Sequence, residues 1–228
     1  EAEENPLLRL GGVDEIVRVV KETGVSVKTI CADYFMEAPL HSYDDKVVEE
    51  SFKILERLLE SAKVLKITDI VIPCVDQSSL ETKEAVDRFV KQVTKIIPTI
   101  EKENINLSLE TDLKPKPFIE LLNKLNSKNI TVNYDIGNSA ALGYNPIEEL
   151  GVYGGRISDI HIKDRMFGSG PVVLGSGDAD FDSFFNALSR IDYHGPFIMQ
   201  AYRDEEGVSI FKSQLDWVKR YFSQLSYD

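Results

Sequence analysis

The chain has 228 residues, 43% of them hydrophobic and 28% charged, and its 38 acidic residues outnumber the 26 basic ones to give a formal net charge of -12. This length can bury a large core, and the composition excludes disordered, collagen-like and coiled-coil chains. The acidic surplus argues against a nucleic-acid partner, because binding to phosphate backbones relies on clustered Lys and Arg. No apolar run approaches the roughly 18 residues needed to cross a membrane, so we expect no membrane partner.

Short apolar runs typical of strands alternate along the chain with longer amphipathic stretches typical of helices. We predict strands at residues 25–31, 69–74, 105–111, 130–135, 157–163 and 197–202. We predict helices at residues 12–22, 45–65, 81–101, 115–126, 146–150, 180–191 and 209–225. Gly24 is expected to end the first helix, and Asp180 is expected to cap the start of the sixth.

This strict alternation predicts parallel strands joined by helical crossovers, hence an α/β protein. An open doubly wound sheet and a closed (β/α)8 TIM barrel both satisfy it, but the GxGxxG fingerprint that would favour the open sheet follows no predicted strand. A barrel needs eight strands and about 250 residues. We therefore expect one TIM-barrel domain over residues 1–228 that lacks the first strand–helix unit and most of the second strand, with EAEENP as the end of that second strand.

In the last four predicted strands apolar residues alternate with polar ones, which places the polar side chains on one face. Helices must cover the apolar face, so the polar face points to the barrel axis. Barrel enzymes build their active sites at the carboxyl ends of the strands. The most distinctive polar residues at or near those ends are Glu110, Asp135, His161 and Gln200.

Glu110 and Asp135 bring two negative charges that no Lys or Arg of their own strands offsets on the same face. Enclosed carboxylates are costly unless they are protonated, paired or bound to a cation. One divalent metal ion neutralises both, and three oxygen ligands with one imidazole suit Mn²⁺, Mg²⁺ or Co²⁺, with Zn²⁺ as a further option. The alternative is four polar strand ends that hydrogen-bond one another without a metal.

The remaining cysteines and histidines have simpler interpretations. Cys31 and Cys74 lie in apolar runs and form no CxxC pair, so we expect two buried thiols in a cytoplasmic protein. His41 and His194 lie close to Pro and Gly in the chain, and we expect both to be solvated turn residues.

Six segments carry a further resemblance through their order and spacing: ICADYFMEAPL, SLETDLKP, VNYDIGNSAALGYNP, ISDIHIKDR, LGSGDADF and GPFIMQAYR. Together they resemble the xylose isomerase-like TIM-barrel superfamily, which includes sugar and sugar-phosphate isomerases and epimerases and is related to endonuclease IV. In that family the ends of strands five to eight supply Glu, Asp, His and Glu to one divalent metal. The resemblance implies that Glu110, Asp135, His161 and Gln200 are these ligands, and that Asn138, Lys163 and Arg165 face the substrate.

Gln200 departs from the family pattern, because many members have Glu there. A Gln oxygen can still coordinate a metal, but it cannot accept a proton at neutral pH. The family's epimerases use two carboxylates on opposite faces of the reacting carbon, and here only Glu110 is evident. We therefore favour chemistry that needs one base over 3-epimerisation, while a base from Lys163, Asp33 or Asp76, or an inactive barrel, stays open.

The predicted function is that of a divalent-metal-dependent sugar or sugar-phosphate isomerase or epimerase. Glu110 removes a proton next to a metal-bound carbonyl, and Lys163 stabilises the charge that develops. The Gly-rich residues 168–178, with Arg165 and Arg203 nearby, could hold a phosphate through backbone N–H groups, and Asp33 could line the pocket. The alternatives are a metal-dependent dehydratase of a polyol or keto acid and a non-catalytic sugar-binding barrel. Assembly as a homo-oligomer stays open.

Overall fold

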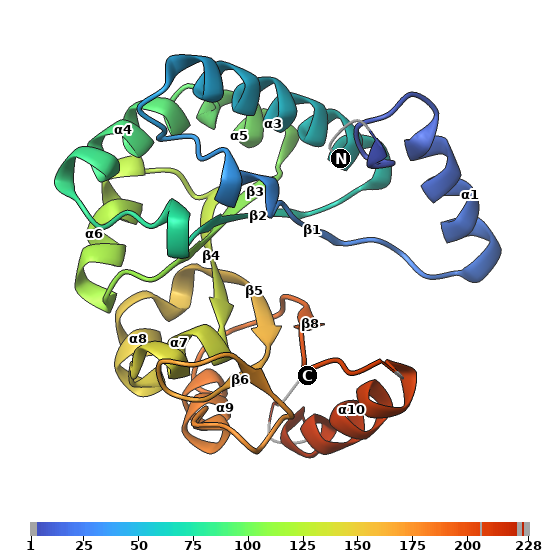
Figure 1. The fold of residues 1–228 in the computed structure, drawn as a ribbon, viewed down its shortest axis with the longest axis vertical. Coiled ribbons are helices and arrows are strands. Elements are labelled where there is room, and N and C mark those ends of the chain that lie inside the picture. Colours follow the sequence, from blue (N-terminus) through green and yellow to red (C-terminus); the bar gives the residue numbers. More distant parts are fainter. Residues whose placement is uncertain (1–3, 206, 223–224, 226–228) are drawn as a thin grey trace. The chain divides into compact units, whose positions relative to one another are not determined.

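The computed structural model describes residues 4–205, 207–222 and 225, and it divides the chain into two compact units. Unit 1 comprises Glu1–Leu113 and Glu120–Thr131, and unit 2 comprises Lys114–Ile119 and Val132–Asp228. Most of unit 1 is coloured blue to green in Figure 1 and most of unit 2 yellow to red. Strands alternate with helices in both units, which confirms the predicted α/β class.

Unit 1 is built on parallel strands β1 (Thr29–Cys31), β2 (Asp69–Cys74) and β3 (Asn106–Thr111). β2 lies between the other two, with Ile70 opposite Ile30 of β1 and Leu107 of β3. Every residue of β2 is buried, as expected for a strand covered on both faces. The helical segments here are α1 (Gly12–Thr23), α2 (Tyr34–Glu37), α3 (Asp45–Leu65), η2 (Asp76–Ser78), α4 (Lys83–Val93) and α5 (Ile97–Glu103).

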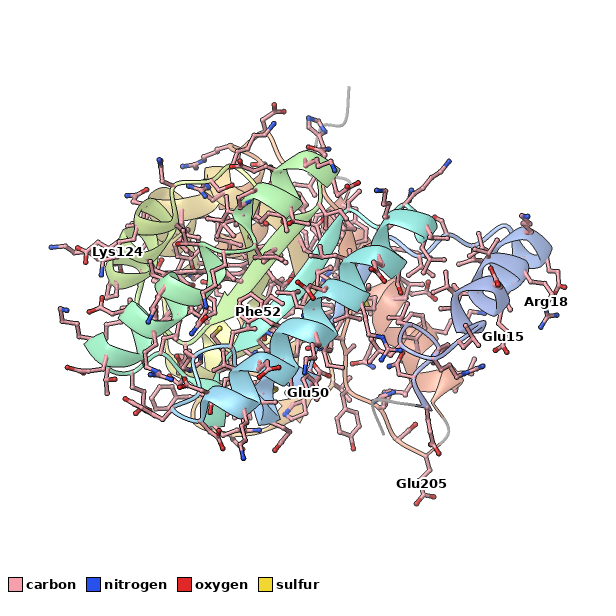
Figure 2. All side chains as sticks on the ribbon, turned by 90° about the horizontal axis from the view of Figure 1, so that it is seen from above. Glu15, Arg18, Glu50, Phe52, Lys124 and Glu205 are labelled. Carbon is pink, nitrogen blue, oxygen red and sulfur yellow. The ribbon has the colours of Figure 1, made fainter. Side chains whose placement is uncertain are left out.

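The longest of these helices, α3, has the predicted bounds, because cap residues at both ends and an apolar stripe define it. The Asp44 side chain accepts a hydrogen bond from Lys46 N at 2.9 Å and caps its start, and Lys66 ends it in the left-handed conformation. Leu55 and Leu58 belong to its buried apolar stripe. Charged side chains such as Glu50 point away from the helix on its other face (Figure 2), so the sequence period of an amphipathic helix is realised.

Unit 2 is built on parallel strands β4 (Ile130–Asp135), β5 (Ile157–Ile162) and β8 (Phe197–Met199) and a short antiparallel pair, β6 (Asp164–Arg165) with β7 (Pro171–Val172). The first two residues of β4 are assigned to unit 1. The helical segments are α7 (Ile136–Leu142), α8 (Pro146–Tyr153), η3 (Gly154–Arg156), α9 (Phe181–Leu188) and α10 (Val208–Phe222). The start of α6 (Pro115–Leu125) belongs to unit 2 and its end to unit 1.

The observed elements differ from the predicted ones mainly where local chemistry interrupts a pattern. The predicted helix 81–101 is two helices, α4 and α5, because Pro98 has no amide hydrogen to donate and starts a new helix instead. The predicted first and last strands shorten to residues 29–31 and 197–199. Residues 4–6 of the EAEENP segment are a 3-10 helical residue, a bend and a turn rather than the end of a strand, and residues 1–3 lie outside the described residues.

An aromatic cluster forms much of the core of unit 2. Phe185 of α9 is fully buried and stacks on Tyr221 of α10 with 4.8 Å between ring centroids. It also meets Phe184 edge to face at 5.1 Å and lies against Phe197 of β8 at 6.0 Å. One side chain thus joins two helices and a strand.

Replacing Phe185 by Ala is therefore expected to destabilise the protein by about 3–5 kcal/mol, because it removes a large buried side chain and leaves a cavity. Urea denaturation followed by circular dichroism measures this change. Phe211→Ala is the matched control, since this Phe of α10 is 42% exposed and should cost less than about 1 kcal/mol. Equal losses for the two variants would contradict the assignment of the core.

Candidate functional site

Three of the four predicted ligands lie at or directly after the carboxyl ends of neighbouring parallel strands in unit 2. Asp135, the last residue of β4, lies opposite His161 of β5 in the strand register. Gln200 directly follows β8, and its backbone N–H donates to the Ile162 carbonyl of β5 at 3.0 Å. Because parallel strands all end at one edge of a sheet, this arrangement brings polar side chains together there.

Asp135 is a buried carboxylate whose two oxygens have different surroundings. Oδ1 accepts the backbone N–H of Asn138 at 2.8 Å and caps the start of α7. Oδ2 is buried and accepts no hydrogen bond from the described residues. The groups facing it are the Lys163 Nζ at 3.5 Å and the His161 Nδ1 at 3.9 Å. A buried acceptor of this kind fits a metal ligand, because a cation would satisfy it.

His161 lies beside this carboxylate with its ring almost completely buried. Its Nδ1 is 3.2 Å from the Asn133 side-chain nitrogen, and the tautomer of the ring sets which atom of this contact donates. The ligand atoms of Asp135 and His161 are close enough to share one ion. Carboxylate and imidazole together suit several first-row divalent metals and Zn²⁺.

Lys163 lies closer to the predicted ligands than the sequence indicated. Its ammonium group donates to Gln200 Oε1 at 3.0 Å and lies 3.5 Å from Asp135 Oδ2. The family resemblance implied that Lys163 lies beyond the ligands and faces a substrate. The structure puts its Nζ between two of the predicted ligand oxygens.

Two of the predicted substrate contacts bind each other. Arg165 donates from Nη1 to Asn138 Oδ1 at 2.8 Å and from Nε to the Ser169 carbonyl at 2.8 Å. This fixes the guanidinium beside the first turn of α7. Arg203 is exposed in the segment after β8.

The other two predicted site residues, Glu110 and Asp33, belong to unit 1. Glu110 is the next-to-last residue of β3, opposite Pro73 of β2, and is 7% exposed. Asp33 is exposed at the start of α2 and accepts a hydrogen bond from Cys31 Sγ at 3.1 Å. Cys31 is exposed, so the expectation of a buried thiol is wrong for it, because it is the last residue of a short strand. The other cysteine, Cys74, is buried as predicted.

Backbone N–H groups of the Gly-rich loop after β5, which were expected to hold a phosphate, bind a side chain of the protein instead. The fully buried Asp164 accepts the amides of Gly175 at 2.8 Å, Gly177 at 2.9 Å and Ala179 at 3.2 Å. A side chain at Gly177 would collide with that carboxylate, whose oxygen would lie 2.2 Å from the added carbon. These N–H groups therefore serve an internal anion, which argues against the expected phosphate site on them. Sequence reasoning missed Asp164, although an acid between a strand and a Gly-rich loop could have indicated it.

A second buried acid holds the elements around Asp135 in place. Glu149 of α8 accepts hydrogen bonds from Tyr134 of β4 at 2.7 Å, Ser139 of α7 at 2.5 Å and Tyr153 of α8 at 2.8 Å. Burial raises the pKa of Glu149 above its ordinary value. The network joins β4, α7 and α8 next to the candidate site, and we interpret it as structural.

The raised pKa of Glu149 predicts a pH dependence of stability. Between pH 4.5, its ordinary pKa, and the raised value, the folded protein keeps a proton that the unfolded chain has released, so stability falls as pH rises. Glu149→Gln should flatten this part of the stability curve, whereas the exposed neighbour variant Glu148→Gln should leave it unchanged. Urea denaturation at a series of pH values between 4 and 8 measures the slope. An unchanged slope in Glu149→Gln would contradict the prediction.

His41 was expected in a solvated turn, but unit 1 buries it. Its ring meets that of Phe89 edge to face at 5.9 Å, and Arg88 Nε donates to the His41 carbonyl at 3.0 Å. Burial is the main cause that lowers the pKa of His41. Helix α4 therefore packs against the loop that contains His41. The local sequence around His41 could not predict this contact, because α4 lies more than 40 residues further along the chain. His194 is exposed as predicted, with Nε2 at 2.7 Å from Asp192.

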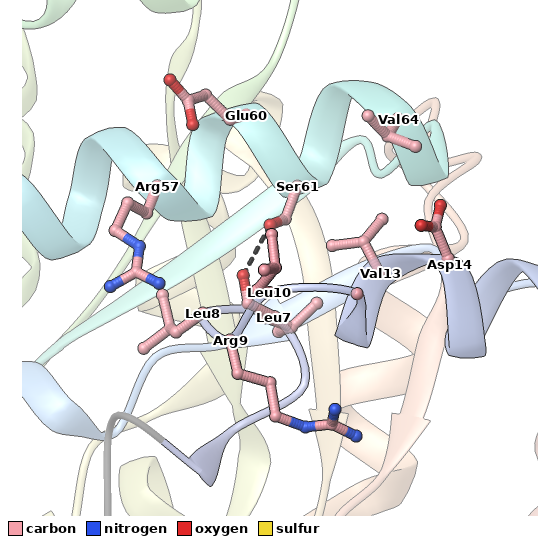
Figure 3. A pocket seen from close by; sticks show the side chains of 11 residues that line it. Leu7, Leu8, Arg9, Leu10, Val13, Asp14, Arg57, Glu60, Ser61 and Val64 are labelled. Carbon is pink, nitrogen blue, oxygen red and sulfur yellow. Dashed lines mark hydrogen bonds between the residues drawn. The ribbon is translucent and has the colours of Figure 1, made fainter.

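A separate groove of about 390 Å³ in unit 1 lies beside α3 (Figure 3). Leu7 and Leu10 on one side and Val64 on the other contribute apolar lining, and Ser61 Oγ donates to the Leu7 carbonyl at 2.6 Å. None of the predicted site residues lines it. We therefore do not assign the chemistry to this groove.

Comparison with known proteins places the chain in a family. Residues 3–221 match the family model described as a xylose isomerase-like TIM barrel. The chain belongs to this xylose isomerase-like TIM barrel family. It is 26% identical over 215 residues to the L-ribulose-5-phosphate 3-epimerase UlaE of Escherichia coli, a match that covers 90% of this chain and 75% of that protein.

Solved structures of other proteins show the same fold. A D-tagatose 3-epimerase-like protein superposes with a TM-score of 0.79 at 18% identity and covers 94% of this chain and 83% of its own. The IolI protein, whose structure is described as binding a zinc atom, superposes with a TM-score of 0.77 at 21% identity and covers 92% and 83%. The predicted TIM-barrel class is thereby confirmed, whereas the prediction of one domain stays a prediction. Among the described residues, no helix is long and apolar enough to cross a membrane.

Proposed function

We propose that this family member is a divalent-metal-dependent epimerase or isomerase of a ketose or ketose phosphate. The observation that carries the proposal is the buried Asp135–His161 pair, whose Asp135 Oδ2 accepts no hydrogen bond from the described residues. Curated relatives named as L-ribulose-5-phosphate 3-epimerases support the substrate class. The pair at the carboxyl ends of β4 and β5 also agrees with the usual place of active sites in barrels.

Asp135, His161 and Gln200 of unit 2 would hold the metal, and Glu110 stays the fourth ligand that the family resemblance implies. A bound divalent ion would polarise the substrate carbonyl and acidify the neighbouring C–H group. Three oxygen donors and one imidazole suit Mn²⁺, Mg²⁺ or Co²⁺ as well as Zn²⁺. The family likeness to the zinc-containing IolI structure supports testing zinc first.

Glu110 would act as the base that takes the proton from carbon. Gln200 offers only an amide, which cannot return a proton on the opposite face at neutral pH. A single base can return the proton on the same face, which suits aldose–ketose isomerisation. Inversion at carbon 3, the activity named for the curated relatives, would need a second proton donor here. We therefore expect isomerisation to be faster than 3-epimerisation.

The remaining polar residues would orient the substrate. Lys163 would donate a hydrogen bond to the oxygen on which charge develops, and the hydrogen-bonded pair of Asn138 and Arg165 would bind hydroxyl or phosphate groups. Asp33 and Arg203 stay proposed contacts from the flanking loops. Two free cysteines support a cytoplasmic location, and the oligomeric state can be measured by light scattering.

Solvent-exchange NMR tests this function directly. The protein is stripped with EDTA, reloaded with one metal at a time and incubated in D₂O with L-ribulose 5-phosphate or D-tagatose. We expect deuterium to enter the carbon next to the carbonyl only after a metal is restored. Exchange that is insensitive to EDTA, or no exchange with any ketose, would overturn the proposal. Water loss to an unsaturated product that absorbs in the ultraviolet would indicate a dehydratase instead.

A further inference from the structure

The Lys163 ammonium lies among the side chains that we propose as metal ligands. It is 3.0 Å from Gln200 Oε1 and 3.5 Å from Asp135 Oδ2. These are the distances of a hydrogen bond and a close ion pair. One cation of the chain thus contacts two of the oxygens that a bound metal would need.

The neighbouring backbone restricts the position of the first side-chain carbons of Lys163. Gly137, in the first turn of α7, lies so close that a Cβ added to it would be 2.8 Å from Lys163 Cγ. The next residue, Asp164, is anchored by three backbone amides. The first carbons of the Lys163 side chain are therefore held beside Asp135 and Gln200. Its terminal carbons can still rotate, because the side chain is 18% exposed.

The charges of Asp135 and Lys163 favour this contact. Asp135 carries one negative charge, which the Lys163 ammonium at 3.5 Å offsets, and Gln200 is neutral. Gln200 also gains a donor for its carbonyl oxygen. An added divalent ion would face the ammonium at short range, where like charges repel strongly in a partly buried site.

We propose that Lys163 is an internal counter-ion that occupies the ligand cage of the metal-free protein and has to swing out before a divalent metal binds. This inference rests on the proposed function, because it needs the metal site. It assigns Lys163 a second role besides substrate contact, namely to weaken metal affinity. Gln200 contributes by holding the ammonium in place.

Titration calorimetry with Zn²⁺ and Mn²⁺ on the EDTA-stripped protein tests this role. Lys163→Met keeps the stem and removes the ammonium, so we expect it to bind metal about tenfold or more tightly than the wild type. Lys212→Met, which removes the same charge from an exposed position in α10, should bind like the wild type. Wild-type affinity in Lys163→Met would overturn the inference and leave the proposed function intact. Absence of metal binding in both proteins would overturn both.

A second measurement uses the wild-type protein and so does not depend on whether Lys163→Met folds. The rate at which an N-hydroxysuccinimide acetate reagent acylates Lys163 is followed by peptide mass spectrometry with and without Zn²⁺. We expect the metal to increase the labelling of Lys163 several-fold by moving its ammonium into solvent, and to leave Lys212 unchanged. Unchanged or slower labelling of Lys163 in the metal-loaded protein would contradict displacement.

Discussion

Replacing Asp135 by Asn is expected to abolish tight metal binding and to lower turnover on the order of 10³-fold. Metal ions contribute several kcal/mol to the stabilisation of developing charge, and each 1.4 kcal/mol corresponds to about a factor of ten in rate. Asn keeps an oxygen that can accept the Asn138 amide, so the cap of α7 is preserved. The variant therefore removes the negative charge and largely spares the local fold. Titration calorimetry and the ketose exchange assay measure the two losses.

The matched control is Asp180→Asn, a second Asp that caps a helix of unit 2. Its side chain accepts the Ser183 amide at 2.9 Å at the start of α9, and it is exposed. This variant should keep wild-type metal affinity and activity. Metal affinity within tenfold of the wild type in Asp135→Asn would show that the buried carboxylate is not a ligand.

Replacing Glu110 by Gln is expected to lower kcat by about 10²–10⁴-fold, the usual contribution of a general base. The amide oxygen of Gln can remain a ligand, so metal affinity should fall less than in Asp135→Asn. The rate of deuterium incorporation from solvent reports the proton-transfer step itself. Loss of exchange with retained metal binding is the result expected for a base.

Glu60→Gln provides the control for Glu110 because it makes the same chemical change in unit 1. Glu60 is exposed on α3 and lines the separate groove beside that helix (Figure 3). It should exchange substrate protons at the wild-type rate. If Glu60→Gln were as inactive as Glu110→Gln, the assignment of the chemistry away from this groove would be wrong. If Glu110→Gln exchanged at the wild-type rate, the base would have to be another residue.

The local sequence pattern was sufficient to predict the bounds of those helices and strands that tertiary contacts do not alter. The predicted bounds of α3, β2 and β4 agree with the structure, because cap residues and apolar periodicity are properties of neighbouring residues. The predicted Asp180 cap and the left-handed Gly24 at the end of α1 are confirmed for the same reason. Helix α7 was missed because its short run IGNSAAL has no amphipathic pattern, and it depends on the Asp135 cap.

The sequence alone determined the alternation of strands and helices, the family, and the identity of the polar residues at the strand ends, since all three are written in residue order and spacing. Only the tertiary structure decided which atoms meet. It placed the Lys163 ammonium against Asp135 and Gln200, and it turned the amides of the Gly-rich loop onto Asp164. The physical reason is that these contacts join residues from different strands and loops, and the direction of a side chain depends on packing around it rather than on its neighbours in the chain.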